Sequence, residues 1–236
     1  MKKIILLLCV TCALKISFAQ SQVEGVLTYQ NVYDDNLGTG TVTTTIYESK
    51  GKARIESTNA QTKSAIDAPS TKDQNIILFD FTTQKETQLN AKMNTAITTG
   101  FTVVMMEQRM QATIGTDYIV QNIGTEQVGT YNCTHFTITT TSSKYKNIPP
   151  AKKDVWITND LGSGNIFYVG SYLYYPLGSS VAQKLTAAGA VGVVVKWQVM
   201  DPISKKPLVC NLISYQPKKI PAATFLPPSN YTAIQR

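Results

Sequence analysis

Residues suited to catalysis or metal binding are scarce in this chain of 236 residues. It has one histidine, His135, and four cysteines, of which only Cys133 and Cys210 lie outside the first 19 residues. It has no G-x-S-x-G nucleophile motif, no phosphate-binding loop and no dinucleotide-binding fingerprint. One histidine and two cysteines also fall short of the four ligands of a structural zinc site. We therefore expect no enzyme, no catalytic residue, no metal and no cofactor.

An apolar run long enough for a permanent transmembrane helix, which needs about 20 such residues, is also missing. The run at residues 4–14 follows Lys2 and Lys3 and ends at Ser17-Phe18-Ala19, where small residues flank a bulky one. This arrangement is typical of a secretory signal peptide. We expect residues 1–19 to be cleaved and residues 20–236 to form a single exported domain.

A lipoprotein anchor is the alternative for this segment, because Cys9 and Cys12 lie within the apolar run. The lipid-accepting cysteine normally follows a leucine, a spacer and a small residue. Cys12 follows Cys9-Val10-Thr11 and Cys9 follows three leucines, so neither fits well. The alternative interpretation is that both are apolar residues of a discarded segment.

A strong excess of one charge is absent as well. The chain has 22 Lys+Arg and 15 Asp+Glu, and removal of three leader lysines leaves 19 against 15, a net charge of +4. Long basic runs with interleaved aromatic residues are lacking, so we expect no nucleic-acid partner. Lysines gather locally, at Lys144, Lys146, Lys152 and Lys153, with the pairs Lys205-Lys206 and Lys218-Lys219 further on. This group either makes peripheral contact with anionic lipids or acidic glycans or is a solvated loop.

Threonine, valine, isoleucine and tyrosine dominate the rest and alternate with other residues, which predicts antiparallel strands. We expect strands near residues 27–33, 42–46, 53–57, 76–79, 84–90, 117–123, 130–140, 153–158, 191–200 and 207–215. Ser49-Lys50-Gly51 predicts a tight turn between the second and third. Ile76–Phe79 is apolar on both faces, so this strand should lie inside the sheet with cover on each side.

Two segments have helical spacing instead. Ser180 begins one, with Gln183 three residues later as in a capping box and Gly189 suited to the left-handed closing position. The other, residues 101–112, contains Met105, Met106 and Met110 and has apolar residues on two sides. We expect the first helix to pack on the sheet and the second to need cover on both sides, although methionines also occur at adaptable binding surfaces.

The cysteines leave alternatives open. Alternation places Cys210 with Leu208 and Leu212, whereas Cys133 lies with His135 opposite Phe136, so the two faces do not obviously match. An exported protein can form a disulfide between them, or both can be buried free thiols. A Cys133–His135 dyad is conceivable, but no third member or oxyanion hole is evident and chance alternation explains the pair equally well.

Aromatic residues gather at residues 167–175, with Tyr172 and Tyr174 among them. Rigid amphipathic rings can line a sugar or lipid site. They can equally cover a flank of the sheet.

Several spaced fragments resemble one family. Residues 122–136, NIGTEQVGTYNCTHF, are similar to a "gly-tyr-x-cys" strand pair, with Thr130 inserted between Gly129 and Tyr131. Residues 154–158, DVWIT, resemble the following strand. The ending is resembled by Ile220-Pro221 with Phe225-Leu226-Pro227-Pro228 and Tyr231. The family is domain of unknown function 4412 of Gram-negative envelopes. The resemblance implies the half-barrel of periplasmic lipoprotein carriers and their receptors (LolA/LolB-like), and it brings no established activity.

Pattern and resemblance together predict a mainly β protein, an incompletely closed antiparallel barrel with one or two helices on its concave side. We expect non-enzymatic binding of an acyl chain or another apolar ligand in the periplasm or cell envelope of a Gram-negative bacterium. Predicted ligand contacts are Phe79, Phe101, Met105, Met106, Met110 and Trp156. The alternative is a structural or adhesive protein whose barrel is filled by its own side chains and whose surface binds a protein or glycan.

Overall fold

The computed structural model describes residues 22–35, 38–64, 75–144, 150–168, 174–176, 179–200 and 206–235. The predicted signal peptide, Lys146 and Tyr172 lie outside these ranges. The strands are β1 (Gly25–Asp35), β2 (Gly38–Ser49), β3 (Lys52–Ser64), β4 (Asn75–Asp80), β5 (Lys85–Asn90), β6 (Thr95–Gly100), β7 (Thr116–Val128), β8 (Tyr131–Ser142), β9 (Ala151–Thr158), β10 (Ile166–Tyr168), β11 (Tyr174–Pro176), β12 (Val193–Met200), β13 (Pro207–Pro217) and β14 (Thr232–Gln235). The helices are α1 (Thr102–Ile114), α2 (Ser180–Ala187) and the 3₁₀ turn η1 (Ala222–Phe225).

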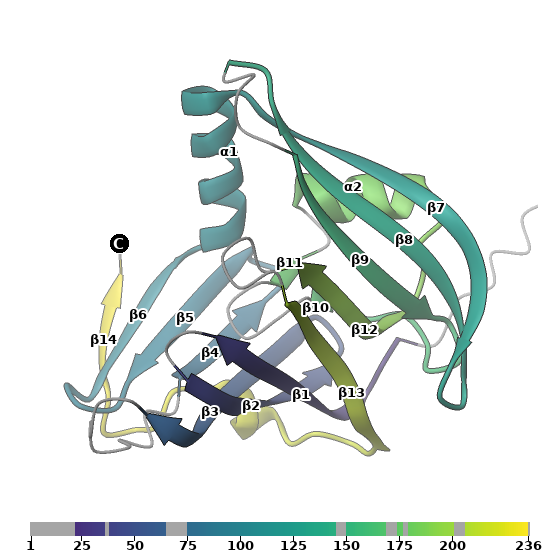
Figure 1. Cartoon of the computed structure of the whole chain (residues 1–236). Helices are drawn as coiled ribbons and strands as arrows, with labels where there is room; N and C mark the ends of the chain where they lie inside the picture. Colours follow the sequence, from purple (N-terminus) through teal and green to yellow (C-terminus); the bar gives the residue numbers. More distant parts are fainter. Residues whose placement is uncertain are drawn as a thin grey trace, which may run out of the picture.

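Twelve of these strands form one curled sheet, in the order β14-β6-β5-β4-β3-β2-β1-β13-β12-β9-β8-β7. Neighbours are antiparallel, apart from the parallel pair β14 and β6. The ends of the order, β14 and β7, are the edges of the sheet, which therefore curls without closing (Figure 1). This confirms the predicted incompletely closed barrel with helices.

The concave face carries the main hydrophobic core. Alternation turns Leu27 and Tyr29 of β1 inward, where both are buried, as is Phe136 of β8 on the other half of the sheet. Helix α2 packs its apolar stripe, which consists of Val181, Ala182 and Leu185, into the same cluster. The Tyr29 hydroxyl donates to the carbonyl oxygen of Val194 in β12 at 2.8 Å. One core therefore joins both halves of the sheet.

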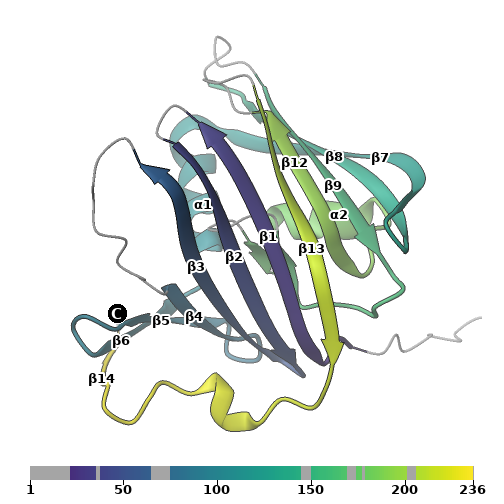
Figure 2. The same ribbon diagram turned by 60° about the horizontal axis from the view of Figure 1, so that its bottom comes forward.

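The convex face is covered in patches by the C-terminal segment, which wraps below the sheet (Figure 2). Phe225 of η1 packs on Val26, and Tyr231 packs in a cluster with Leu78. Strand β4 is thus apolar on both sides, because Phe79 points into the main core while Leu78 points outward. This confirms its predicted place inside the sheet.

The helices differ in detail from the sequence-based expectation. Helix α2 begins at the predicted residue, but the capping side chain is that of Ser179, whose hydroxyl accepts from the Ala182 amide at 3.2 Å. Gly189 has the expected positive φ, 93°. For α1, the expectation of cover on both sides was wrong, because only Val103 and Glu107 are buried. Strands β6, β10, β11 and β14 were not predicted.

Candidate functional site

Two buried carboxylates hold the helices in place. Glu86 of β5 accepts hydrogen bonds from both the amide (2.9 Å) and the hydroxyl of Thr102, at the start of α1. Glu107 of α1 accepts from the amides of Ser180 (2.8 Å) and Val181 (3.4 Å), at the start of α2. A negative charge at a helix N-terminus is stabilised by the unpaired amides and by the helix dipole. The two helices are therefore linked in series to the sheet.

The predicted ligand residues divide into three groups. Phe79 and Phe101 come together, with ring centroids 6.0 Å apart. The ring centroid of Phe81 lies 6.0 Å from that of Phe79 and 5.7 Å from that of Phe101. Phe79 and Phe101 are almost fully buried, so these aromatic rings pack together beneath the start of α1. The three methionines, Met105, Met106 and Met110, lie on α1 but are 47%, 51% and 37% exposed.

Trp156 belongs to neither group, because it lies on the convex face of the sheet. It packs in a separate cluster with Cys133 and Val195, and the His135 ring stacks on it with centroids 4.4 Å apart. The Lys196 ammonium lies 4.3 Å from the centroid of the Trp156 ring. The structure therefore does not bring Trp156 to the same side as Phe79. Successive side chains of β9 point to opposite faces of the sheet, and that of Trp156 points outward.

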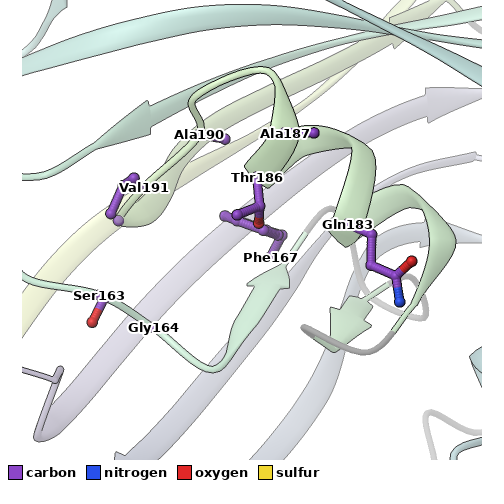
Figure 3. Close-up of a pocket in the computed structure, with 9 residues that line it drawn as sticks. Ser163, Gly164, Phe167, Gln183, Thr186, Ala187, Ala190 and Val191 are labelled. Carbon is purple, nitrogen blue, oxygen red and sulfur yellow. The ribbon is translucent and has the colours of Figure 1, made fainter.

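A pocket opens instead at the C-terminal end of α2 (Figure 3). It has a volume of about 540 Å³ and lies between α2, the loop before β10 and the loop before β12. Its lining is formed by Ser163, Gly164, Phe167, Gln183, Thr186, Ala187, Ala190, Val191 and Gly192. This volume falls in the range of small-molecule sites, and few polar side chains border it.

Sequence reasoning missed this pocket. It explained the glycines at 162 and 164 as a plain turn and used Gly189 only as the end of a helix. Their common property is small size, which leaves space between the two loops. At Gly192, an added Cβ would lie 1.8 Å from the carbonyl oxygen of Thr158, so only glycine fits there. A cluster of small residues on both sides of a predicted helix was the available signal.

The wall of the pocket formed by Ser163 and Gly164 is fixed from behind. The Val23 amide donates to the carbonyl oxygen of Ser163 at 2.9 Å. The side-chain amide of Asn165 donates to Glu48 Oε1 at 2.8 Å, and the backbone amide of Asn165 donates to the same oxygen. Glu48 is 2% exposed, and burial raises its pKa to about 7 despite the two hydrogen bonds from Asn165. An ionisable group therefore lies directly behind an apolar pocket.

The convex-face cluster does not form a nucleophilic dyad. The Cys133 thiol donates to the carbonyl oxygen of Tyr131 at 3.6 Å, and burial raises the pKa of this thiol to about 11. His135 is engaged elsewhere: Nε2 lies 3.1 Å from Asp154 Oδ1 and Nδ1 lies 3.4 Å from Glu126 Oε1. A thiol that stays protonated at neutral pH is a poor nucleophile.

The two cysteines are buried free thiols. Cys133 lies in the convex cluster and Cys210 in the main core. Strands β9 and β12 separate β8 from β13, and Cys210 is in register with Phe136, three residues along β8 from Cys133. Three strand spacings of about 4.8 Å and three residues of about 3.4 Å along the strand place the two Cα atoms more than about 14 Å apart. A disulfide spans less than about 7 Å between Cα atoms. The structure thus excludes the disulfide and favours the alternative of two free thiols.

Within the described ranges, no three histidine, cysteine or acidic side chains are grouped so that they could hold a metal ion. No helix among the described residues is both long and apolar enough to cross a membrane.

Comparison with known proteins finds one family. Its sequence model, Domain of unknown function (DUF4412), matches residues 23–231. No curated protein matches the chain. The matched range includes every strand except the last, β14, and both helices.

Proposed function

The chain belongs to the DUF4412 family, and from this premise we propose that it is a non-enzymatic binding protein that holds an acyl chain or another apolar ligand. The observation that carries the proposal is the pocket of about 540 Å³ at the end of α2. Phe167, Ala190 and Val191 offer apolar contacts, and Ser163 and Gln183 offer hydrogen bonds at its margin. Such a lining suits a ligand with a long apolar part and a small polar end.

Its place of action, on this proposal, is the periplasm or cell envelope of a Gram-negative bacterium. The support is the leader-like segment 1–19, with two lysines before a short apolar run. Neither cysteine of the described residues is activated as a nucleophile, which supports a binding role over cysteine-based catalysis. Of the described cysteines, Cys133 has a pKa raised to about 11 and Cys210 one raised to about 12, in both cases mainly by burial.

The test measures ligand binding in the pocket. The exported protein is purified, and N-phenyl-1-naphthylamine is added as an apolar fluorescent probe that palmitate can displace. Ala187 is exposed at the pocket, so Ala187→Trp should fill the space without disturbing the core and should lower probe affinity by at least tenfold. Ala112→Trp is the matched control, because Ala112 is an exposed helical alanine on α1.

The proposal fails if the probe does not bind, or if palmitate never displaces it and mass spectrometry of the gently purified protein finds no lipid. It also fails if Ala187→Trp binds the probe as tightly as the control does.

One observation favours a second candidate, a structural or adhesive protein. The concave face is filled by the protein's own side chains, including those of α2, as the core cluster containing Phe136 and Leu185 indicates. A filled half-barrel needs no ligand to be stable. Under this candidate, adding palmitate to the purified protein would leave its unfolding temperature unchanged. A bound apolar ligand would raise that temperature.

A further inference from the structure

The outer side of α1 combines apolar and basic groups. Met105, Met106 and Met110 are 47%, 51% and 37% exposed, and Arg109 is also exposed. Helical spacing places Met105 and Met106 one turn before Arg109, so the methionines surround the guanidinium-bearing position. Glu107 points to the other side and is buried, and Val103, which shares the side of Met106 and Met110, is buried in the first turn of the helix. Figure 1 shows α1 standing at the open edge of the sheet, with one side turned away from it.

The charge of this surface is positive. Among the described residues, no carboxylate lies within ion-pair distance of Arg109, and the one acidic residue of α1, Glu107, is buried against the start of α2. Lys144 is exposed at the C-terminal end of α1, where its ammonium donates to the carbonyl oxygens of Ala112 (2.6 Å) and Thr113 (3.3 Å). Lys152, at the start of β9, has a side chain that is 62% exposed, and its ammonium lies 3.8 Å from Asp154 Oδ1, so its charge is partly balanced.

These cations lie at one end of the molecule. The Ser143 amide donates to the carbonyl oxygen of Gly115 at 3.0 Å, which ties the end of β8 to the end of α1. Lys152 pairs with Thr139 of β8, three residues before the end of that strand. Arg109 and Lys144 therefore border the methionines, and Lys152 lies further along the same end.

We propose that the outer side of α1 docks on a bilayer surface that contains anionic phospholipids. Met105, Met106 and Met110 enter the boundary between headgroups and acyl chains, and Arg109 and Lys144 contact lipid phosphates. Methionine is unbranched and flexible, so it fits an irregular acyl surface, and an arginine side chain can extend its charge to the headgroups from among apolar neighbours. A helix with one apolar side bordered by cations is suited to lie in a membrane interface. This proposal is independent of the pocket at α2.

The test is vesicle co-sedimentation of the purified exported protein. Vesicles of phosphatidylethanolamine with one quarter phosphatidylglycerol should bind the protein, and vesicles of phosphatidylcholine alone should bind it at least tenfold more weakly. Binding to the anionic vesicles should weaken in high salt, because screening reduces the attraction between exposed charges.

Substitutions locate the surface. Met105→Gln with Met106→Gln should reduce affinity for the anionic vesicles by about tenfold or more, because part of the buried apolar area is lost. Arg109→Gln should reduce it by about fivefold, as expected for one cation near an anionic surface. Met93→Gln and Lys92→Gln are the matched controls, because both residues are exposed in the turn between β5 and β6. That turn lies the whole length of β6 away from the start of α1.

The result that overturns the proposal is specific. The proposal is overturned if the protein does not sediment with anionic vesicles. It is also overturned if the α1 variants bind these vesicles as well as the two controls do while keeping the wild-type unfolding temperature. A dimer that depends on Met105 and Met106, found by light scattering without vesicle binding, would assign the surface to a second copy and would also overturn it.

Discussion

Glu48 is a single residue whose surroundings change its chemistry. It lies at the end of β2, it is 2% exposed, and its Oε1 accepts two hydrogen bonds from Asn165. An added Cβ on Gly164 would lie 3.5 Å from Glu48 Oε2, so the carboxylate is directly behind the pocket wall. Burial raises the pKa of Glu48 to about 7. At neutral pH the folded protein therefore contains a mixture of the charged and neutral forms.

This residue predicts a pH dependence of stability. The folded protein keeps the Glu48 proton up to a pH of about 7, whereas the unfolded chain releases it near its ordinary pKa of 4.5. Between these values the folded state binds more protons, so its free energy of unfolding falls as the pH rises. The loss from this group is at most about 3 kcal/mol. We expect Glu48→Gln, which stays neutral and can still accept from Asn165, to be progressively more stable than the wild type from pH 4.5 to 7.5.

Urea unfolding at pH 4.5, 6 and 7.5 measures this difference. Glu24→Gln is the control, because it makes the same substitution at a glutamate that is only half-buried. A constant difference between Glu48→Gln and the wild type at all three pH values would contradict the assignment.

At the scale of elements, α1 supports α2 through one side chain. Glu107 supplies acceptors to two amides at the start of α2, and the same helix carries Gln183, Thr186 and Ala187 of the pocket. Helix α2 has only eight residues, too few to be stable alone, so its position depends on its cap and its packing. Removing the carboxylate leaves the Ser180 amide without its acceptor, close to the core.

Glu107→Ala should therefore lower the free energy of unfolding by about 1–3 kcal/mol, the cost of an unsatisfied buried donor. Gln108→Ala is the neighbouring control, because Gln108 is exposed on the same helix and its loss should change stability by less than about 0.5 kcal/mol. Urea unfolding of both variants measures the difference. Equal stabilities would show that the link between the helices contributes nothing.

Local patterns predicted most elements but not all. Strands with alternating apolar residues, such as β1 and β8, were expected near their observed places, because half-buried strands leave a period of two in the sequence. Strand β6, TAITTG, has only two aliphatic side chains, and it is a strand because β5 and β14 pair with it. Strand β14 pairs in parallel with β6 from the far end of the chain, a contact that no local pattern contains. Tertiary context decided both cases.

At the scale of the whole molecule, the sheet brings distant segments together and separates near ones. The pocket combines residues 163–167, 183–187 and 190–192, whose spacing depends on how the loops cross the end of α2. Phe79 and Trp156, both predicted to line one cavity, lie on opposite faces of the same sheet. Strand alternation indicates which residues share a face, but it does not indicate which face of each strand turns inward. That choice is made by the complete core.

This continuous core predicts a single cooperative unfolding transition. The main cluster includes Leu27 and Ile46 from one half of the sheet and Phe136 and Val155 from the other, so neither half can lose its packing alone.

The tryptophan residues, Trp156 and Trp197, both lie in the half formed by β7 to β9 and β12, whereas far-ultraviolet circular dichroism reports on all strands. If the protein is one domain, tryptophan fluorescence and circular dichroism should give the same urea midpoint. Trp156→Phe keeps an aromatic side chain in the convex cluster and leaves Trp197 as the reporter in the core, and its two signals should also coincide. Two separated midpoints in the wild type would mean that the halves of the sheet unfold independently, and the description as one domain would then be wrong.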